Sequence, residues 1–115
     1  MSCNTTFIGP PMDIATGYPF AVRAIRLRTG TRTVYVPDGD VLLRIGQPGE
    51  DAVLEVTLTL QASDTDPYWC LPDPGLTAEQ TATLGGLSGP RYVVVDATTG
   101  WVLLEGAVSV RVLPL

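Results

Sequence analysis

Apolar and polar residues alternate with a period of two along much of this chain. The clearest case is the run 53–60, in which every second side chain is apolar: Leu54, Val56, Leu58 and Leu60. Successive side chains of a β-strand point to opposite faces. The run therefore predicts a strand with its leucine and valine face in the core and its other face in water.

Similar short runs rich in Val, Ile, Thr and Tyr recur between turn residues. We expect further strands at 20–28, 31–36, 41–45, 68–71, 91–95, 101–104 and 107–113. In the run 20–28 the apolar phase changes near Ala24, which predicts a bulge or a change of partner. The dipeptide Glu105-Gly106 is expected to interrupt the last two strands.

One segment has the pattern of a helix. Thr77 stands three residues before Gln80, the spacing of a capping box, in which each side chain accepts a hydrogen bond from the other residue's backbone N–H. Leu76 and Leu84 are placed to anchor this segment to a sheet, and Gly85-Gly86 ends it. The sequence predicts one short helix at about residues 77–84.

These elements fit a single all-β domain spanning residues 1–115. Seven to nine short strands with one helix favour an antiparallel β-sandwich, with a β-barrel as the alternative. Residues 1–16 are expected to form an extended or mobile N-terminal arm. A hydrophobic content of 45% with 17% charged residues agrees with a packed domain and excludes a disordered tail.

Composition argues against an enzyme. The chain has no histidine, which removes the usual general base near neutral pH and the commonest metal ligand, so we expect no catalytic residues, no metal and no cofactor. A small metal-dependent hydrolase, or a calcium site at Asp64, Asp66 and Asp73, is the alternative interpretation. Acidic loops between strands are more often simply solvated.

Charge and cysteine content restrict the partners. All seven basic residues are arginine and the net charge is −5, so we expect no nucleic acid partner. Four arginines, Arg23, Arg26, Arg28 and Arg32, fall within ten residues and suit contacts with acidic neighbours.

Cys3 and Cys70 are expected as thiols, and a disulfide between them is the alternative. No apolar run reaches the roughly 18 residues of a membrane span, and the N-terminus lacks a secretory signal, so we expect synthesis in a cytoplasm and no membrane partner.

The segment from Leu76 to Val110 adds a resemblance. It contains the capped helix, a glycine-rich step, the strand Arg91-Tyr92-Val93-Val94-Val95-Asp96, a glycine turn and a closing strand with Leu104-Glu105-Gly106. This order resembles the C-terminal half of small immunoglobulin-like domains of tailed bacteriophages and prophages, including the N-terminal domain of upper baseplate proteins. The earlier half of the chain is similar only in pattern.

The resemblance implies an immunoglobulin-like sandwich with Thr77, Gln80, Tyr92 and Gly106 as its structural motif. It also implies that the Tyr92 hydroxyl bonds the backbone of the crossover, as in a tyrosine corner, and an ordinary half-buried strand tyrosine is the alternative. The coiled coil and receptor-binding regions of baseplate proteins have no counterpart in these 115 residues. We therefore expect a small virion component: a head decoration, or a tail, baseplate or neck accessory.

The expected function is docking without turnover. Candidate interface residues are Tyr68, Trp69 and Trp101 with the four clustered arginines. The expected partners are phage head or tail structural proteins and further copies of the chain. A carbohydrate-binding module that stacks Trp69 and Trp101 on sugar rings is the alternative from another functional class.

Overall fold

The part of the chain that the structure describes folds into an all-β structure with one short helix, as the sequence predicts. The structure is a computed structural model, and it describes residues 7–21, 25–27, 39–61, 67–71 and 75–111. Its elements, in chain order, are β1 (Phe7–Ile8), β2 (Met12–Ala15), β3 (Val41–Gly46), β4 (Leu54–Thr57), β5 (Thr59–Gln61), β6 (Tyr68–Cys70), α1 (Ala78–Ala82), β7 (Arg91–Asp96) and β8 (Val102–Arg111). The strand predicted at 31–36 lies outside the described residues.

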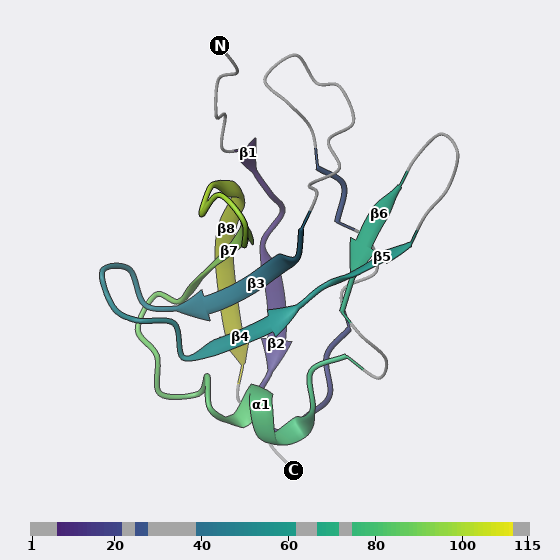
Figure 1. Ribbon diagram of the computed structural model, residues 1–115. Coiled ribbons are helices and arrows are strands. Elements are labelled where there is room, and N and C mark those ends of the chain that lie inside the picture. The colour runs from purple at the N-terminus through teal and green to yellow at the C-terminus, as the bar shows by residue number, and fades with distance from the viewer. Residues whose placement is uncertain (1–6, 22–24, 28–38, 62–66, 72–74, 112–115) are drawn as a thin grey trace.

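Six strands form the larger sheet. Its order is β1-β8-β7-β3-β4. The remaining strand, β2, also pairs with β8, farther along that strand than β1 does. In Figure 1, β3 and β4 run across the view in front of β2, β7 and β8, so the sheet is strongly curled, as twisted strands require. The pairs β3–β4, β3–β7 and β7–β8 are antiparallel, whereas β1 and β2 run parallel to β8. The expectation of a purely antiparallel sheet was therefore wrong, and the sheet is mixed.

The parallel strands come from the N-terminal segment that was expected to be an arm. Within it, Met12 and Ile14 are buried and belong to the core, while Ile8 is 81% exposed. Residues 7–15 are therefore an integral edge of the larger sheet. The Gly9-Pro10-Pro11 step separates the two strands, because proline has no N–H to donate to β8.

The smaller sheet pairs β5 with β6, to one side of the larger sheet in Figure 1. Leu58 alone separates β4 from β5, and its N–H still donates to the Val41 carbonyl of the larger sheet. The strand predicted at 53–60 thus changes partners in its middle. Leu60 lies directly opposite the buried Trp69 and so has the inward phase that the sequence predicts, yet in this two-stranded sheet it is 42% exposed.

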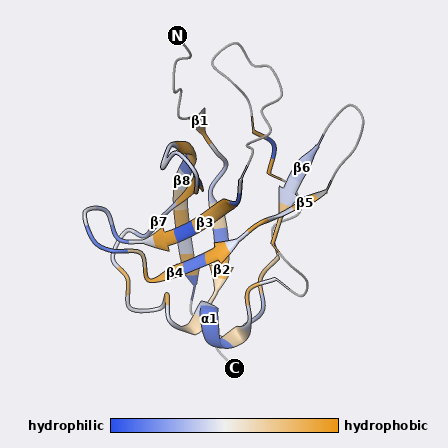
Figure 2. Ribbon diagram, in the orientation of Figure 1, coloured by the Kyte–Doolittle hydropathy of each residue, from blue (hydrophilic) through white to orange (hydrophobic). Residues whose placement is uncertain are grey.

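The core lies on one face of the larger sheet, toward the smaller sheet and α1. Directly opposed inward residues include Leu43 with Val94 and Ile45 with Tyr92, all nearly fully buried. In Figure 2, orange hydrophobic segments recur along the strands of the larger sheet. Cross-strand pairs of this kind are the unit of sheet stability.

The helix forms as its sequence predicts, although it is shorter. Thr77 is its N-cap, and the reciprocal capping box with Gln80 is present, with N···O distances of 3.1 Å and 2.9 Å. Leu76 and Leu84, both with 0% exposure, anchor its two ends in the core. The capping box therefore fixes where α1 begins, and the buried leucines fix how it lies.

The expected interruption at Glu105-Gly106 is absent, since β8 runs unbroken from Val102 to Arg111. Gly106 lies directly opposite Tyr92, whose ring covers it so closely that a Cβ at position 106 would collide with the ring. The glycine is thus needed for close packing inside a strand rather than for a break in it.

Candidate docking surfaces

The structure brings together two residues predicted for the interface, Arg26 and Tyr68. An antiparallel bridge joins Ile25 to Trp69, which sets Arg26 beside Tyr68 on the opposite face of the strands. The Arg26 Cζ lies 5.6 Å from the centre of the Tyr68 ring, within the range of a cation–π contact. Arg26 is exposed and Tyr68 half-buried, so this pair presents an aromatic and a guanidinium surface to solvent.

Trp69 does not contribute to a surface. It is 3% exposed and belongs to the core cluster, because alternation along β6 turns it inward where Tyr68 turns outward. Its inclusion among the interface residues and in a sugar-binding platform was therefore wrong. Trp101 is half-buried and follows the turn between β7 and β8 of the larger sheet. Arg23, Arg28 and Arg32 lie outside the described residues.

The face of the larger sheet that is directed away from the core forms a second surface, which we call the outer face. Opposed residues of a sheet share a face, so the register places two rows here. One row contains Glu55, Arg44, Val93, Glu105 and Ile8, from β4 across to β1. The other contains Thr57, Leu42, Val95 and Val102.

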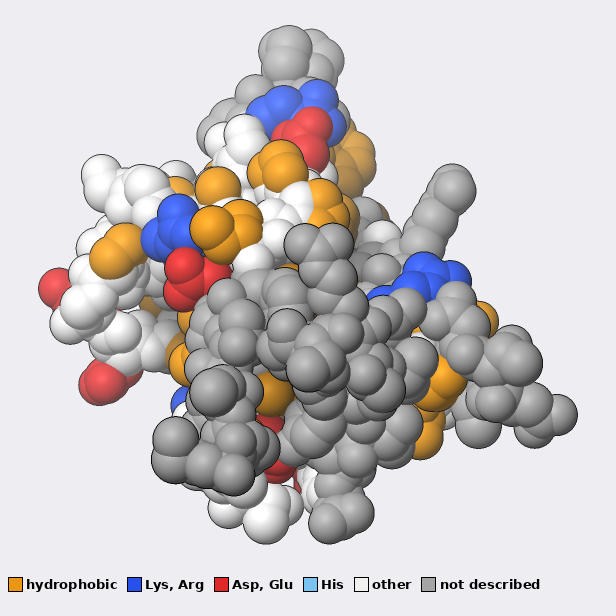
Figure 3. All heavy atoms as spheres, turned by 90° about the horizontal axis from the view of Figure 1, so that it is seen from above, with side chains coloured by type: hydrophobic (Ala, Val, Ile, Leu, Met, Phe, Trp, Pro, Cys, Tyr) orange, Lys and Arg blue, Asp and Glu red, His pale blue; other side chains and the backbone are white. Residues whose placement is uncertain are grey.

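Ion pairs connect neighbouring strands of the outer face. The Arg44 Nε lies 2.6 Å from a carboxylate oxygen of Glu55. The Arg91 guanidinium lies 3.8 Å from a carboxylate oxygen of Glu105. At the far edge, Arg111 on β8 bonds Asp13 on β2 at 2.7 Å. In Figure 3, which views the molecule from above, blue and red side chains lie next to each other beside orange ones. These pairs are about half exposed, so each adds little to stability and mainly orders the surface.

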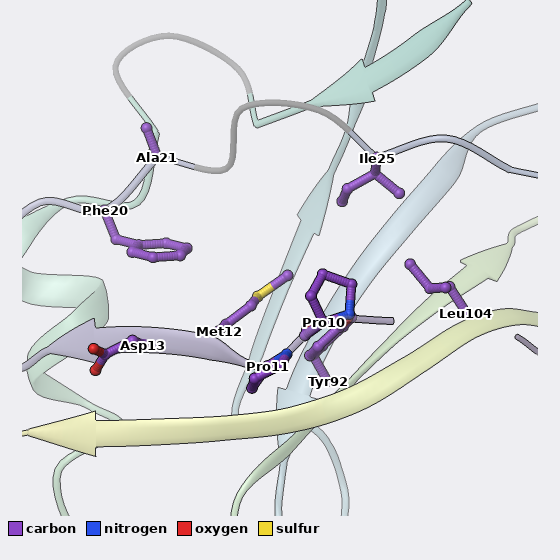
Figure 4. Close-up of a pocket in the computed structure, with 9 residues that line it drawn as sticks. All are labelled: Pro10, Pro11, Met12, Asp13, Phe20, Ala21, Ile25, Tyr92 and Leu104. Carbon is purple, nitrogen blue, oxygen red and sulfur yellow. The ribbon is translucent and has the colours of Figure 1, made fainter. Parts of the chain in front are cut away.

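A pocket of about 330 Å³ opens beside the break between β1 and β2. Figure 4 shows its lining, which consists of Pro10, Pro11, Met12, Asp13, Phe20, Ala21, Ile25, Tyr92 and Leu104. Its walls are mostly apolar, and its polar groups already have partners. Asp13 pairs with Arg111, and the Tyr92 hydroxyl donates to the Pro10 carbonyl at 2.8 Å. Such a pocket suits contact with apolar groups rather than acid–base chemistry.

The Tyr92 bond answers the question of the tyrosine corner. The hydroxyl bonds the N-terminal segment at Pro10, 82 residues upstream, and not the backbone of the helical crossover. Tyr92 is also 1% exposed rather than half-buried. Burial raises the pKa of its hydroxyl, and the Arg91 guanidinium partly opposes that rise. The motif tyrosine therefore ties the N-terminal edge to β7.

Within the described part of the chain, no group of three or more His, Cys, Asp or Glu side chains is placed to bind a metal ion. Asp64, Asp66 and Asp73 are outside that part, so the calcium alternative stays a prediction. No helix among the described residues is long and apolar enough to span a membrane.

Comparison with known families, curated proteins and solved structures finds no match for this chain. The surfaces described above are therefore interpreted from their own geometry. Sequence reasoning missed the outer face, because its charged residues are far apart in the sequence and meet only through strand register. The outward phase of Arg44 and Glu55 was the only available signal.

Proposed function

We propose that this chain is a non-enzymatic structural protein of a tailed phage virion, made in the bacterial host and incorporated into the particle. It binds a head or tail protein through surface complementarity and requires no cofactor. Its proposed architecture is an immunoglobulin-like sandwich in which the larger sheet faces the smaller one.

Two features support the sandwich. The bridge Ile25–Trp69 sets Ile25 beside β6 of the smaller sheet, and the bridge Phe20–Leu76 sets Phe20 beside the residue that precedes the helix N-cap. The helix α1 leads from this side to β7 in the larger sheet, so it crosses between the two layers. Aligned sheets that enclose one core are the usual solution for a domain of this size.

The observation that carries the docking proposal is the exposed Arg26 guanidinium over the Tyr68 ring. Tyrosine and arginine are enriched in protein interfaces and in their energetic hot spots, while lysine is depleted. The chain agrees with this pattern, since its seven basic residues are all arginine. A partner surface with acidic side chains would meet the guanidinium, and an apolar side chain beside them would cover the ring.

The test uses phage particles produced by the host strain that encodes the chain. Density-gradient purification followed by quantitative mass spectrometry is expected to find the chain in a fixed ratio to the major structural proteins. In the variant Arg26→Ala/Tyr68→Ala that ratio is expected to fall at least tenfold, since loss of two hot-spot side chains exceeds about 1.4 kcal/mol.

The matched control is Arg44→Ala, which removes an arginine whose side chain is 41% exposed on the larger sheet and should leave incorporation unchanged. Circular dichroism of each variant checks that it folds. Absence of the wild-type chain from purified particles would refute the virion assignment. Undiminished incorporation of the double variant would refute the docking surface.

Burial of Trp69 removes one of the two rings on which the carbohydrate alternative depended. Titration of the chain with bacterial surface oligosaccharides, followed by tryptophan fluorescence, is expected to show no saturable change. A saturable change lost in Trp101→Ala would favour the carbohydrate-binding alternative.

A further inference from the structure

The outer face contains apolar side chains that the core does not account for. Val95 is 3% exposed, yet it lies outside the cluster of core residues. Its register partners Leu42 and Val102 are half-buried on the same face, and Val93 lies in the next row. Val95 is already covered within the single chain, so the apolar surface that a partner can contact on this face comes from the half-buried Leu42, Val93 and Val102, which we call the apolar centre.

Charged residues flank the apolar centre in balanced numbers. Among the described residues, three arginines and three acids project from the outer face and its edge, namely Arg44, Arg91, Arg111, Asp13, Glu55 and Glu105. The charges of these six residues sum to zero, so the rest of the chain carries the whole formal charge of −5. An apolar centre with a polar, paired border is the usual anatomy of a protein interface.

The charge balance indicates which partner fits. Copies of a chain with charge −5 repel one another wherever acidic surface is presented, and at the neutral outer face that repulsion is small. A strongly acidic or basic partner would gain no net attraction from a neutral face. A second copy presents both signs interleaved on neighbouring strands, so its arginines and acids can meet those of the first copy.

We propose that the outer face is the contact surface between two copies of this chain, related by a two-fold axis. Such an interface is isologous, with the same patch contributed by each copy. The two apolar centres bury each other, and the arginines of each copy gain acidic neighbours across the contact. This inference names a partner and a surface that docking through Arg26 and Tyr68 does not require.

The test measures self-association of the purified full chain by sedimentation velocity over a concentration series. The wild-type chain is expected to form a reversible dimer. Arg44→Glu leaves two like charges side by side on each copy and should weaken the dimer at least tenfold. Glu55→Arg, the second single variant, should do the same. Both residues are about half exposed, so the fold is expected to tolerate each change.

The charge-swapped double variant Arg44→Glu/Glu55→Arg restores neutrality and the pair between β3 and β4. Its dimer is expected to return to within about threefold of the wild-type affinity, a difference of less than 1 kcal/mol. Arg26→Glu, on the side of the smaller sheet, is the control. Its dimer affinity should also stay within about threefold of the wild-type value.

A wild-type chain that stays monomeric throughout the series would overturn the proposal. So would a dimer that both single variants leave intact, because association would then use another surface. The dimer proposal can fail independently of the virion assignment, because the two are tested by different measurements. Incorporation into particles is measured with variants of Arg26 and Tyr68, and self-association is measured with variants of Arg44 and Glu55.

Discussion

Tyr92 connects three parts of the structure through one side chain. Its ring lies over Gly106 on β8, its hydroxyl donates to Pro10 in the break between β1 and β2, and its backbone belongs to β7. A tyrosine packed over a strand glycine recovers the contact area that the glycine lacks. This residue therefore holds the parallel edge of the sheet against its centre.

Tyr92→Phe tests the hydroxyl separately from the ring. Loss of the bond to Pro10 is expected to lower the free energy of unfolding by about 0.5–1.5 kcal/mol at neutral pH, as measured by urea denaturation. Because burial raises the pKa of this hydroxyl in the folded state, the folded protein holds its proton more tightly than the unfolded chain does.

The raised pKa adds to the free energy of unfolding. This contribution is fully present below pH 10.0, the tyrosine pKa in the unfolded chain, and it is lost as the pH rises through the higher pKa of the folded protein. The difference between wild type and Tyr92→Phe should thus shrink above about pH 10. A difference that stays constant up to pH 11 would contradict the assigned direction of the shift.

Gly106→Ala tests the close approach beneath the Tyr92 ring. The added methyl group would collide with the ring, so we expect a loss of about 1–3 kcal/mol in the free energy of unfolding, typical of an overpacked core. Gly86→Ala is the matched control, since a Cβ there meets nothing within 4 Å. Equal stability of the two variants, compared by thermal denaturation, would show that the ring moves aside at little cost.

Single residues were predictable from sequence where their chemistry is local. The capping box of Thr77 and Gln80 depends on a spacing of three residues, so sequence alone sufficed to place it. The partner of Tyr92 was not predictable in this way. Pro10 lies 82 residues upstream, and only the path of the folded chain brings its carbonyl to the hydroxyl.

At the scale of elements, the N-terminal strands depart most from expectation. The segment 12–15 alternates Met12, Asp13, Ile14 and Ala15, which is a strand pattern, but it is short and close to the chain terminus. Its partner β8 is nearly a hundred residues away and parallel, and no local turn links the two. Sequence reasoning recognises hairpins through their turns, and a parallel edge strand offers no such signal.

Two isoleucines of these strands give a matched test of whether the segment is structural. Ile14→Ala removes a fully buried side chain and is expected to lower the free energy of unfolding by about 2–5 kcal/mol. Ile8→Ala changes a side chain that is 81% exposed and should alter stability by less than about 0.5 kcal/mol. Chemical denaturation of both variants checks the difference, and similar small effects would indicate an arm that is not packed on the sheet.

At the scale of the whole molecule, the two surfaces differ in what sequence could disclose. Arg26 and Tyr68 were among the predicted interface residues, because clustered arginines and aromatic side chains are visible in composition. Trp69 was included on the same grounds and is internal, since side-chain type does not reveal which face of a strand it occupies. The neutral outer face emerges only when charges from five separate strands are placed in register.

The passage of the chain through Leu58 links the two sheets without a loop. Thr57 ends β4 and Thr59 begins β5, so one extended stretch of backbone belongs to both layers. A connection of this kind leaves no slack, and a mechanical pull on the outer edge of the larger sheet is passed directly along the backbone to the smaller one. A domain connected in this way would resist tension as one unit, with its two layers loaded together.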